Sequence, residues 1–245
     1  MAEFSVSNRL LQMLPPDAFA RIRPDLERIR LAPGERVRRA FEPMTDALFP
    51  ESGLLSFFVG RGGRDQTEVA LLGREGMAGL CALLGPAGGP FDLVSQKAGE
   101  AHRMPLERLK AACEGCPCLS DLLMRYAYAL TVQIAETGRA NARQTVETRL
   151  ARWLLMAHDR IDGDEIELTH ETLSLILGVR RPGITVALHM LEGERMIRAR
   201  RGVVEILDRP RLRQATNGAY GLPEQEYERV LGPPRPGRDG TRRAA

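Results

Sequence analysis

The stretch Leu168–Leu191 constrains the fold of this chain more than any other, because it predicts two short helices joined by a tight turn. Thr169 is a favourable N-cap for the first helix. Gly178 falls where the chain leaves that helix and needs the left-handed conformation, which glycine adopts without a Cβ clash. Pro182 lies in the first turn of the second helix, where its missing N–H costs nothing. This order of signals predicts a helix-turn-helix unit.

The second helix of this unit, about Arg181–Leu191, separates into an apolar face and a polar face. The apolar residues recur with helical spacing and are expected to be buried: Ile184, Ala187, Leu188 and Leu191. The opposite face carries Arg181, Thr185 and His189. In a helix-turn-helix such a face enters the major groove of double-stranded DNA, where arginine bonded to guanine is the commonest specific contact. We therefore predict that these three side chains contact base edges.

The segment that follows, Met196–Ile206, alternates apolar and charged residues on both sides of Arg201-Gly202, as a β-hairpin does. Seven arginines and two acidic residues occur between Arg195 and Arg213, a local charge of +5. A helix-turn-helix followed by a basic hairpin is a winged helix, whose hairpin is expected to face DNA phosphates. The predicted phosphate contacts are Arg180, Arg200, Arg201 and the N–H groups of the helix that Thr169 caps.

A helical hairpin inside an enzyme core is the alternative interpretation of the same pattern. The sequence contains no paired carboxylates, Ser–His–Asp set, Walker loop or HExxH motif. Its histidines are scattered, at His102, His158, His170 and His189. We therefore expect a DNA-binding protein and not an enzyme, and we predict no cofactor.

Residues from about Arg143 to Arg213 resemble the C-terminal domain of the Crp/Fnr (cyclic-AMP receptor and fumarate–nitrate regulator) family of bacterial transcription factors. Three segments carry the resemblance: VETRLARWLL at Val146–Leu155, LTHETLSLILGVRR at Leu168–Arg181, and the wing at Ile197–Ile206. The resemblance implies that Arg181 is the arginine that contacts bases and phosphates near the start of the recognition helix. Pro182 and Val186 stand where the best-known members carry glutamate and arginine, so the known operator sequence is not expected to apply.

Between Pro24 and Met104 the sequence is rich in glycine and turn residues that separate short apolar runs, a pattern that predicts a sandwich or jelly roll. The candidate strands are Asp25–Leu31, Ala47–Pro50, Gly53–Gly60, Glu68–Leu72, Leu93–Ser95 and Ala101–Met104. The strand and turn at Leu31–Glu35 resemble the cyclic-nucleotide-binding fold. The expected fold class is α+β, with an N-terminal cyclic-nucleotide-binding-like β jelly roll, a long dimerisation helix and a C-terminal winged helix-turn-helix.

In cyclic-nucleotide-binding relatives, a short helix after a Gly-Glu pair holds the phosphate, an acidic residue holds the ribose and an arginine neutralises the phosphate. The matching stretch here is Gly73–Leu80, in which Ala78 takes the place of the acidic residue. Gly85–Val94 contains no arginine, and Arg74, the alternative candidate for this role, is expected to face solvent at a turn. Because charge-assisted hydrogen bonds contribute roughly 1.5–3 kcal/mol each, cyclic AMP is disfavoured as the effector, whose identity stays open.

A long helical pattern from Leu119 to about Arg139 follows the jelly roll. Its apolar positions alternate at spacings of four and three, which suits a partner helix: Leu119, Leu123, Tyr126, Leu130 and Gln133. A helix packed on its own barrel through Leu122 and Ile134 is the alternative. This helix dimerises in the family, so the resemblance implies a homodimer that contacts half-sites roughly 34–36 Å apart and, as an activator, RNA polymerase. Gly138–Asn141 is the predicted hinge to the DNA-binding domain.

Three of the four cysteines lie in the run CEGCPC, at Cys113, Cys116 and Cys118, and the fourth is Cys81. Such thiols suggest a second hypothesis, a regulator that senses a metal, an iron–sulfur cluster or redox state. The spacing is not a standard complete motif, and the cluster-carrying relatives place most of their cysteines near the N-terminus. Free structural cysteines are the favoured interpretation, so no metal site is predicted.

At 245 residues the chain has room for two domains, and its net charge of +3 is too small to indicate a partner. It shows no apolar run of membrane-spanning length and no signal-peptide pattern, so we expect a cytoplasmic protein without membrane contact. The predicted divisions are 1–112 for the sensory β-barrel, 113–142 for the dimerisation helix and hinge, 143–213 for the winged helix, and 214–245 for a mobile tail.

Overall fold

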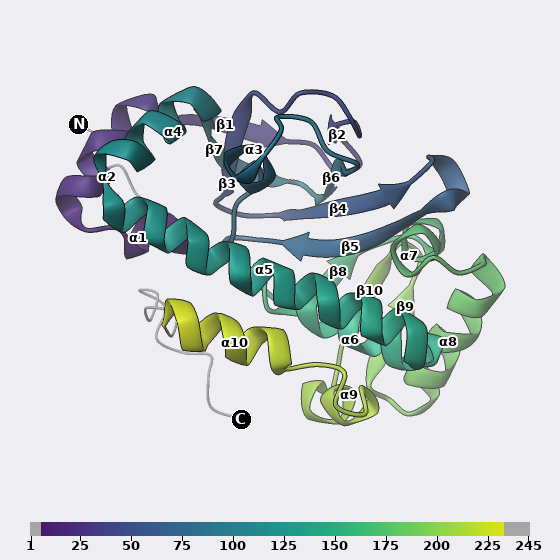
Figure 1. Ribbon diagram of the computed structural model, residues 1–245. Coiled ribbons are helices and arrows are strands. Elements are labelled where there is room, and N and C mark those ends of the chain that lie inside the picture. Colours follow the sequence, from purple (N-terminus) through teal and green to yellow (C-terminus); the bar gives the residue numbers. More distant parts are fainter. Residues whose placement is uncertain (1–5, 233–245) are drawn as a thin grey trace.

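The computed structural model describes residues 6–232, so the end of the predicted tail, 233–245, lies outside the described residues. Figure 1 shows a strand-rich N-terminal half and a smaller C-terminal half, with the helix α5 (Pro117–Arg143) running along both. Strands dominate the first half and helices the second, which confirms the α+β class. Among the described helices none is long and apolar enough to cross a membrane.

Two antiparallel sheets form the N-terminal barrel, in the orders β1-β7-β3 and β2-β6-β4-β5. Their strands are β1 (Glu27–Leu31), β2 (Arg36–Arg38), β3 (Asp46–Pro50), β4 (Leu54–Gly60), β5 (Gln66–Leu72), β6 (Asp92–Lys97) and β7 (Gly99–Pro105). All six predicted strands are present, with ends that differ by one or two residues. The sequence pattern missed β2, because Val37 between two arginines is too short a run to show alternation.

Short helices flank the barrel: α1 (Arg9–Met13), α2 (Pro16–Ile22), α3 (Leu80–Leu84) and α4 (Leu106–Gly115), with 3-10 turns at Arg23–Asp25 and Gly63–Asp65. The helix α4 was not expected from the sequence pattern. Only Leu106 and Leu109 of this helix are buried, so its apolar period is weak. The expected division between residues 112 and 113 therefore falls inside α4.

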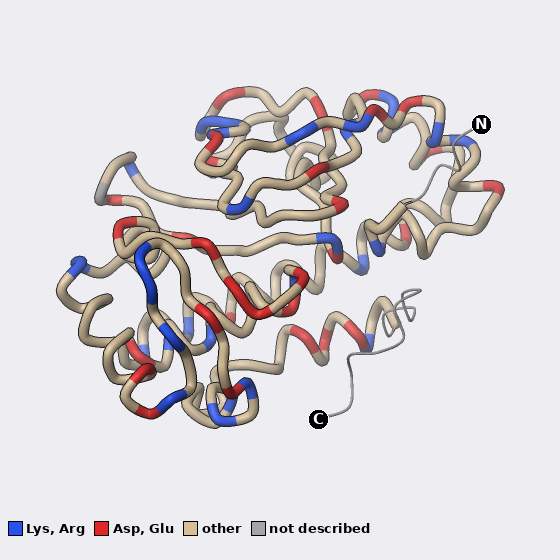
Figure 2. The backbone as a smooth tube through the Cα atoms, turned by 180° about the vertical axis from the view of Figure 1, so that it is seen from behind, with Lys and Arg blue, Asp and Glu red and all other residues tan. Residues whose placement is uncertain are grey.

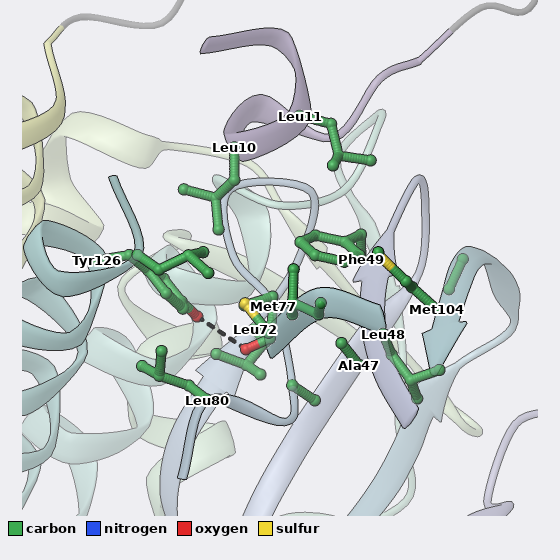
Figure 3. Packing of buried hydrophobic residues seen from close by; sticks show 14 of the residues in the cluster. Leu10, Leu11, Ala47, Leu48, Phe49, Leu72, Met77, Leu80, Met104 and Tyr126 are labelled. Carbon is green, nitrogen blue, oxygen red and sulfur yellow. Dashed lines mark hydrogen bonds between the residues drawn. The ribbon is translucent and has the colours of Figure 1, made fainter. Parts of the chain in front are cut away.

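Apolar side chains fill the interior of the barrel. Figure 3 shows side chains from α1, β3, β5, the turn after β5 and α5 meeting in one cluster. Phe49, Met77 and Met104 lie in it and are at most 1% exposed. The Tyr126 hydroxyl of α5 donates a hydrogen bond to the Met77 carbonyl at 3.3 Å, which ties the long helix to the barrel.

The stripe on α5 that was predicted to face a partner helix packs on the barrel of the same chain, so that prediction is wrong. All five of its residues are at most 7% exposed: Leu119, Leu123, Tyr126, Leu130 and Gln133. The reason is that the apolar barrel end beside α5 needs covering, and a helix of the same chain covers it. Of the two residues in the alternative assignment, Leu122 is buried and Ile134 is 36% exposed.

The predicted hinge at Gly138–Asn141 is also wrong, because α5 continues through it to Arg143. A single exposed glycine costs a helix only about 1 kcal/mol relative to alanine, and the long helix tolerates it. The chain leaves the helix at Gln144, which is extended. The Thr145 hydroxyl then accepts a hydrogen bond from the Thr148 N–H and begins α6.

The C-terminal half contains the helices α6 (Val146–His158), α7 (His170–Leu177), α8 (Arg181–Gly193) and α9 (Arg209–Ala215). A three-stranded sheet in the order β8-β10-β9 completes it, formed by β8 (Glu165–Glu167), β9 (Ile197–Arg200) and β10 (Val203–Ile206). The two helices predicted for the helix-turn-helix, α7 and α8, and the predicted hairpin are present, whereas the sequence pattern did not indicate α9 or β8. Leu54, Phe58 and Leu71 of the barrel join its apolar core, so the two halves share one buried junction.

Residues 214–232 form structure in place of the expected mobile tail. They contain α10 (Leu222–Leu231), which lies along α5 in Figure 1. Leu231 is buried in the barrel cluster, and the Tyr227 hydroxyl donates to the Glu75 carbonyl at 2.6 Å. Composition could not predict this helix, because a few specific contacts hold α10 in place and the segment has no general excess of apolar residues.

Candidate nucleic-acid interface

The turn between α7 and α8 has the local chemistry that the sequence predicted. The Thr169 hydroxyl accepts the Thr172 N–H at 3.1 Å, and Gly178 ends α7 with φ at 60°. The Ser174 hydroxyl donates to the Val179 carbonyl at 2.5 Å, which closes the turn from inside. These contacts set the angle at which α8 leaves α7.

The helix α8 has one buried and one open face. Its buried residues are those predicted and are at most 4% exposed: Ile184, Ala187, Leu188 and Leu191. On the other face Arg181 and His189 are exposed, and the Arg181 guanidinium lies 3.7 Å from the Glu171 carboxylate. Thr185 is only half-exposed, because its hydroxyl donates to the Arg181 carbonyl and lies 3.2 Å from His170 Nδ1. The structure thus brings the three predicted base contacts to one face but holds Thr185 in local hydrogen bonds.

Two apolar residues also lie on this open face, and the sequence pattern did not single out the second of them, Met190. Val186 and Met190 are each 55% exposed on α8. They follow Thr185 and His189 by one residue, so helical spacing alone places them beside the predicted contacts. These two apolar side chains lie one helical turn apart on the open face of α8, where both are available to contact a partner.

The wing is less basic in the structure than its arginine count suggests. The Arg200 guanidinium lies 3.0 Å from Glu205 and 3.8 Å from Glu165. Figure 2 shows acidic and basic residues side by side on this half of the molecule. Arg201 is exposed at the hairpin turn and Arg180 at the start of α8, and neither forms an ion pair within the described part of the chain. Since exposed ion pairs contribute only about 0–1 kcal/mol, a phosphate can compete for Arg200.

The stretch that corresponds to the nucleotide phosphate cradle is closed against a strand. Ala78 exchanges two backbone hydrogen bonds with Leu48 of β3, at 2.9 and 3.0 Å, and is fully buried. Arg74 is half-buried and pairs with Asp162 at 2.8 Å, so the expectation that it faces solvent is wrong. The Asp162 carboxylate, on the C-terminal half, attracts the Arg74 guanidinium across the junction of the two halves.

The four cysteines are free. Cys81 and Cys118 are exposed, and burial raises the pKa of the half-buried Cys113 thiol. A hydrogen bond from Cys118 holds the pKa of the Cys116 thiol below its usual value. Within residues 6–232 no three side chains of histidine, cysteine, aspartate or glutamate are arranged to hold a metal ion.

A second stripe on α5 is open to solvent, one residue further along than the buried stripe. Its members are exposed or half-buried, with spacings of four and three: Ser120, Met124, Ala127, Thr131, Ile134 and Gly138. The residues are mostly small, which permits close approach of another helix. We call this set the α5 outer stripe. It has the heptad spacing of a helix–helix seam.

Residues 148–215 match the family of Crp-like helix-turn-helix domains. No curated protein matches the chain. Among solved structures, a transcriptional regulator of the Crp/Fnr family from Eubacterium rectale is 20% identical with a TM-score of 0.67, over 85% of this chain and 98% of its own. FixK2 from Bradyrhizobium japonicum is 15% identical with a TM-score of 0.67, over 78% of this chain and 96% of its own. The chain therefore shares the fold of these regulators, and its residues 148–215 form a Crp-like helix-turn-helix domain.

Proposed function

We propose that the chain acts as a homodimer that places α8 of each subunit in the major groove of an operator. The observation that carries this proposal is the two-faced character of α8. One face is packed into the core, while Arg181, Val186, His189 and Met190 remain open on the other. A recognition helix needs such a rigid support and such a free face.

Arg181 is the principal base-contacting residue in this proposal. Its guanidinium can donate two hydrogen bonds to the O6 and N7 atoms of guanine. The ion pair with Glu171 is exposed at both ends, so a base can replace it at small cost. Thr185, bonded to the Arg181 carbonyl and near His170, serves better to orient the helix than to contact a base.

Val186 and Met190 favour thymine in the operator. Both side chains are apolar and half-exposed beside the predicted hydrogen-bonding residues. The only apolar group that a base presents in the major groove is the 5-methyl group of thymine. Burying that methyl against Val186 or Met190 removes apolar surface from water on both sides.

Phosphate contacts orient the domain on the duplex. Arg180 at the start of α8 and Arg201 at the wing turn are exposed and free of ion pairs within the described chain, so they are the best suited. The N-terminus of α7 behind Thr169 offers backbone N–H groups to another phosphate. Arg200 contributes after exchanging Glu205 for a phosphate oxygen.

The α5 outer stripe supports the homodimer. Packing Met124, Thr131 and Ile134 against the same residues of a second copy would cover side chains that one chain leaves open. A two-fold axis along this seam would give two recognition helices for half-sites roughly 34–36 Å apart.

Cyclic AMP is not the proposed effector. Ala78 offers no carboxylate to a ribose, and its backbone is bonded to β3. Redox sensing is a second candidate, which rests on the lowered pKa of Cys116 beside Cys118, since a thiolate is the reactive form. If it operates, peroxide should change the DNA affinity of the wild type reversibly with dithiothreitol, and Cys116→Ser should remove the change. An equal response in that variant would discard the redox candidate.

Selection of genomic DNA fragments with the purified full-length protein tests the main proposal. We expect an enriched operator with two similar half-sites. Arg181→Ala should weaken binding to it by about 1–3 kcal/mol and relax one position in each half-site. Arg30→Ala, on a solvent-exposed side chain of the barrel, is the matched control. Unchanged affinity in Arg181→Ala would contradict the assignment of α8.

A further inference from the structure

A cavity of about 550 Å³ lies where the barrel, α5, the end of α6 and the C-terminal helices α9 and α10 meet. This volume falls within the range of small-molecule sites. It borders the packed cluster of Figure 3, with which it shares Tyr126, and α10, which the sequence did not predict, forms one of its walls. Three tyrosines, including Tyr126 and Tyr227, add aromatic surface.

Five arginine side chains line this cavity and come from both halves of the protein: Arg9, Arg74, Arg160, Arg209 and Arg213. Arg160 is held in the wall, since its guanidinium lies 2.7 Å from Glu75 and donates to the Met156 carbonyl at 2.7 Å. Arg209 is held by Asp159 and by the Tyr220 hydroxyl. These two arginines are paired with carboxylates that also line the cavity, so the arginines without such partners are the ones available to an anion.

The three other arginines differ from these. Arg9 on α1 and Arg213 on α9 form no ion pair with a carboxylate among residues 6–232. Arg74 has an exposed partner, Asp162, whose side chain is 86% accessible. Burial raises the pKa of Glu224 in the cavity wall, and the acidic residues Glu75, Asp159 and Glu228 also line the cavity. The cavity therefore has spare cationic groups on both of its sides.

We propose that this cavity is the effector site of the protein and binds a small organic anion that carries phosphate or carboxylate groups. Arg9 and Arg74 hold its anionic groups from the barrel, and Arg213 holds them from the C-terminal half. Guanidinium groups suit either chemistry, because their paired N–H donors match the oxygens of carboxylates and phosphates.

Such a ligand would join parts of the molecule whose relative position governs α8. The cavity walls include Gln133 of α5 and Arg160 after α6, the helix on which the recognition unit packs. The hydrogen bond from Tyr227 to the Glu75 carbonyl fixes α10 to the barrel at the cavity edge. An anion bridging Arg9 or Arg74 to Arg213 would stabilise one arrangement of the two halves over others.

Calorimetric titration of the full-length protein tests this site without DNA, so its outcome is independent of the proposed operator binding. The probes are inorganic pyrophosphate and, in a second titration, citrate. We expect saturable binding of at least one probe, and the probe that binds identifies phosphate or carboxylate as the recognised group. Arg9→Gln and Arg213→Gln should each raise the dissociation constant at least tenfold. Arg30→Gln, on the far exposed barrel strand, should leave it unchanged.

Because Arg9 and Arg213 form no ion pair in the described chain, both variants should melt at the wild-type temperature. Arg9→Lys and Arg213→Lys keep the charge but lose the paired donors, and they should bind with intermediate affinity. Absence of saturable binding for both probes would overturn the proposal. Binding that both glutamine variants retain in full would overturn it as well, because the anion would then lie elsewhere.

Discussion

The indole N–H of Trp153 on α6 donates a 2.8 Å hydrogen bond to the Glu68 carboxylate on β5, across the junction of the two halves. Glu68 is 4% exposed, and Ser56 donates to its other oxygen. Burial outweighs these hydrogen bonds and raises the pKa of Glu68 to about 7. The contact that joins barrel and winged domain is therefore sensitive to pH near neutrality.

This pKa predicts how stability depends on pH. The Glu68 carboxyl titrates near 4.5 when unfolded and near 7 when folded, so folding favours the protonated form. The contribution of protonated Glu68 to the free energy of unfolding is complete below about pH 4.5 and is lost as the pH rises through 7. Relative to Glu68→Gln, the wild type should lose about 2–3 kcal/mol of unfolding free energy between pH 4.5 and 7.5. Urea unfolding at several pH values measures this. The control Ser56→Ala keeps the Glu68 carboxyl and should show the same loss of stability with rising pH as the wild type. If the unfolding free energies of the wild type and Glu68→Gln changed in parallel with pH, the raised pKa of Glu68 would be refuted.

The ion pair between Arg160 and Glu75 should contribute far more to stability than the pair between Arg74 and Asp162. The former side chains are 7% and 12% exposed, whereas Asp162 is 86% exposed. Glu75→Ala leaves a buried guanidinium without its carboxylate and should cost about 3–5 kcal/mol. Asp162→Ala should cost less than about 1 kcal/mol. Chemical denaturation of both variants provides the comparison, and equal losses would show that burial does not separate them.

Replacing thymine by uracil in the selected operator tests the role of Val186. Loss of one contacted methyl group should weaken binding about fourfold, since a buried methylene is worth about 0.8 kcal/mol. Val186→Ala should bind both operators with nearly equal affinity. Uracil at a position outside the half-sites serves as the control. A full thymine preference in Val186→Ala would assign the methyl contact to another residue, with Met190→Ala as the next variant.

A charge placed in the α5 outer stripe should dissociate the proposed dimer. Thr131→Asp sets two carboxylates against each other across the two-fold axis, where like charges repel and lose hydration. Light scattering after size-exclusion chromatography should give the monomer mass for this variant and the dimer mass for the wild type. Lys110→Asp makes a similar change on the exposed side of α4 and should remain dimeric. A dimeric Thr131→Asp would place the interface elsewhere.

The recognition unit could be predicted from sequence because its signals are local. The N-cap at Thr169, the left-handed Gly178 and the apolar spacing of α8 each act within a few residues. The same is true of the barrel strands, whose alternation and turns fixed their ends to within two residues. The stripes of α5 are different, because their partners are remote in the chain. Heptad spacing on two adjacent stripes shows that a helix has buried faces, but it does not show whether the same chain or a second copy covers each one.

The amino-acid sequence by itself determined six of the barrel strands, the helix-turn-helix and the buried face of α8, because dihedral preferences and side-chain periodicity act over short distances. Only the tertiary structure decided which stripe of α5 stays open and that residues 222–231 form a helix, α10, packed against α5. It also brought five arginines to the lining of one cavity. These features depend on contacts between residues far apart in the chain, such as Tyr227 with Glu75 and Trp153 with Glu68. Long-range packing of this kind leaves no periodic trace in the sequence.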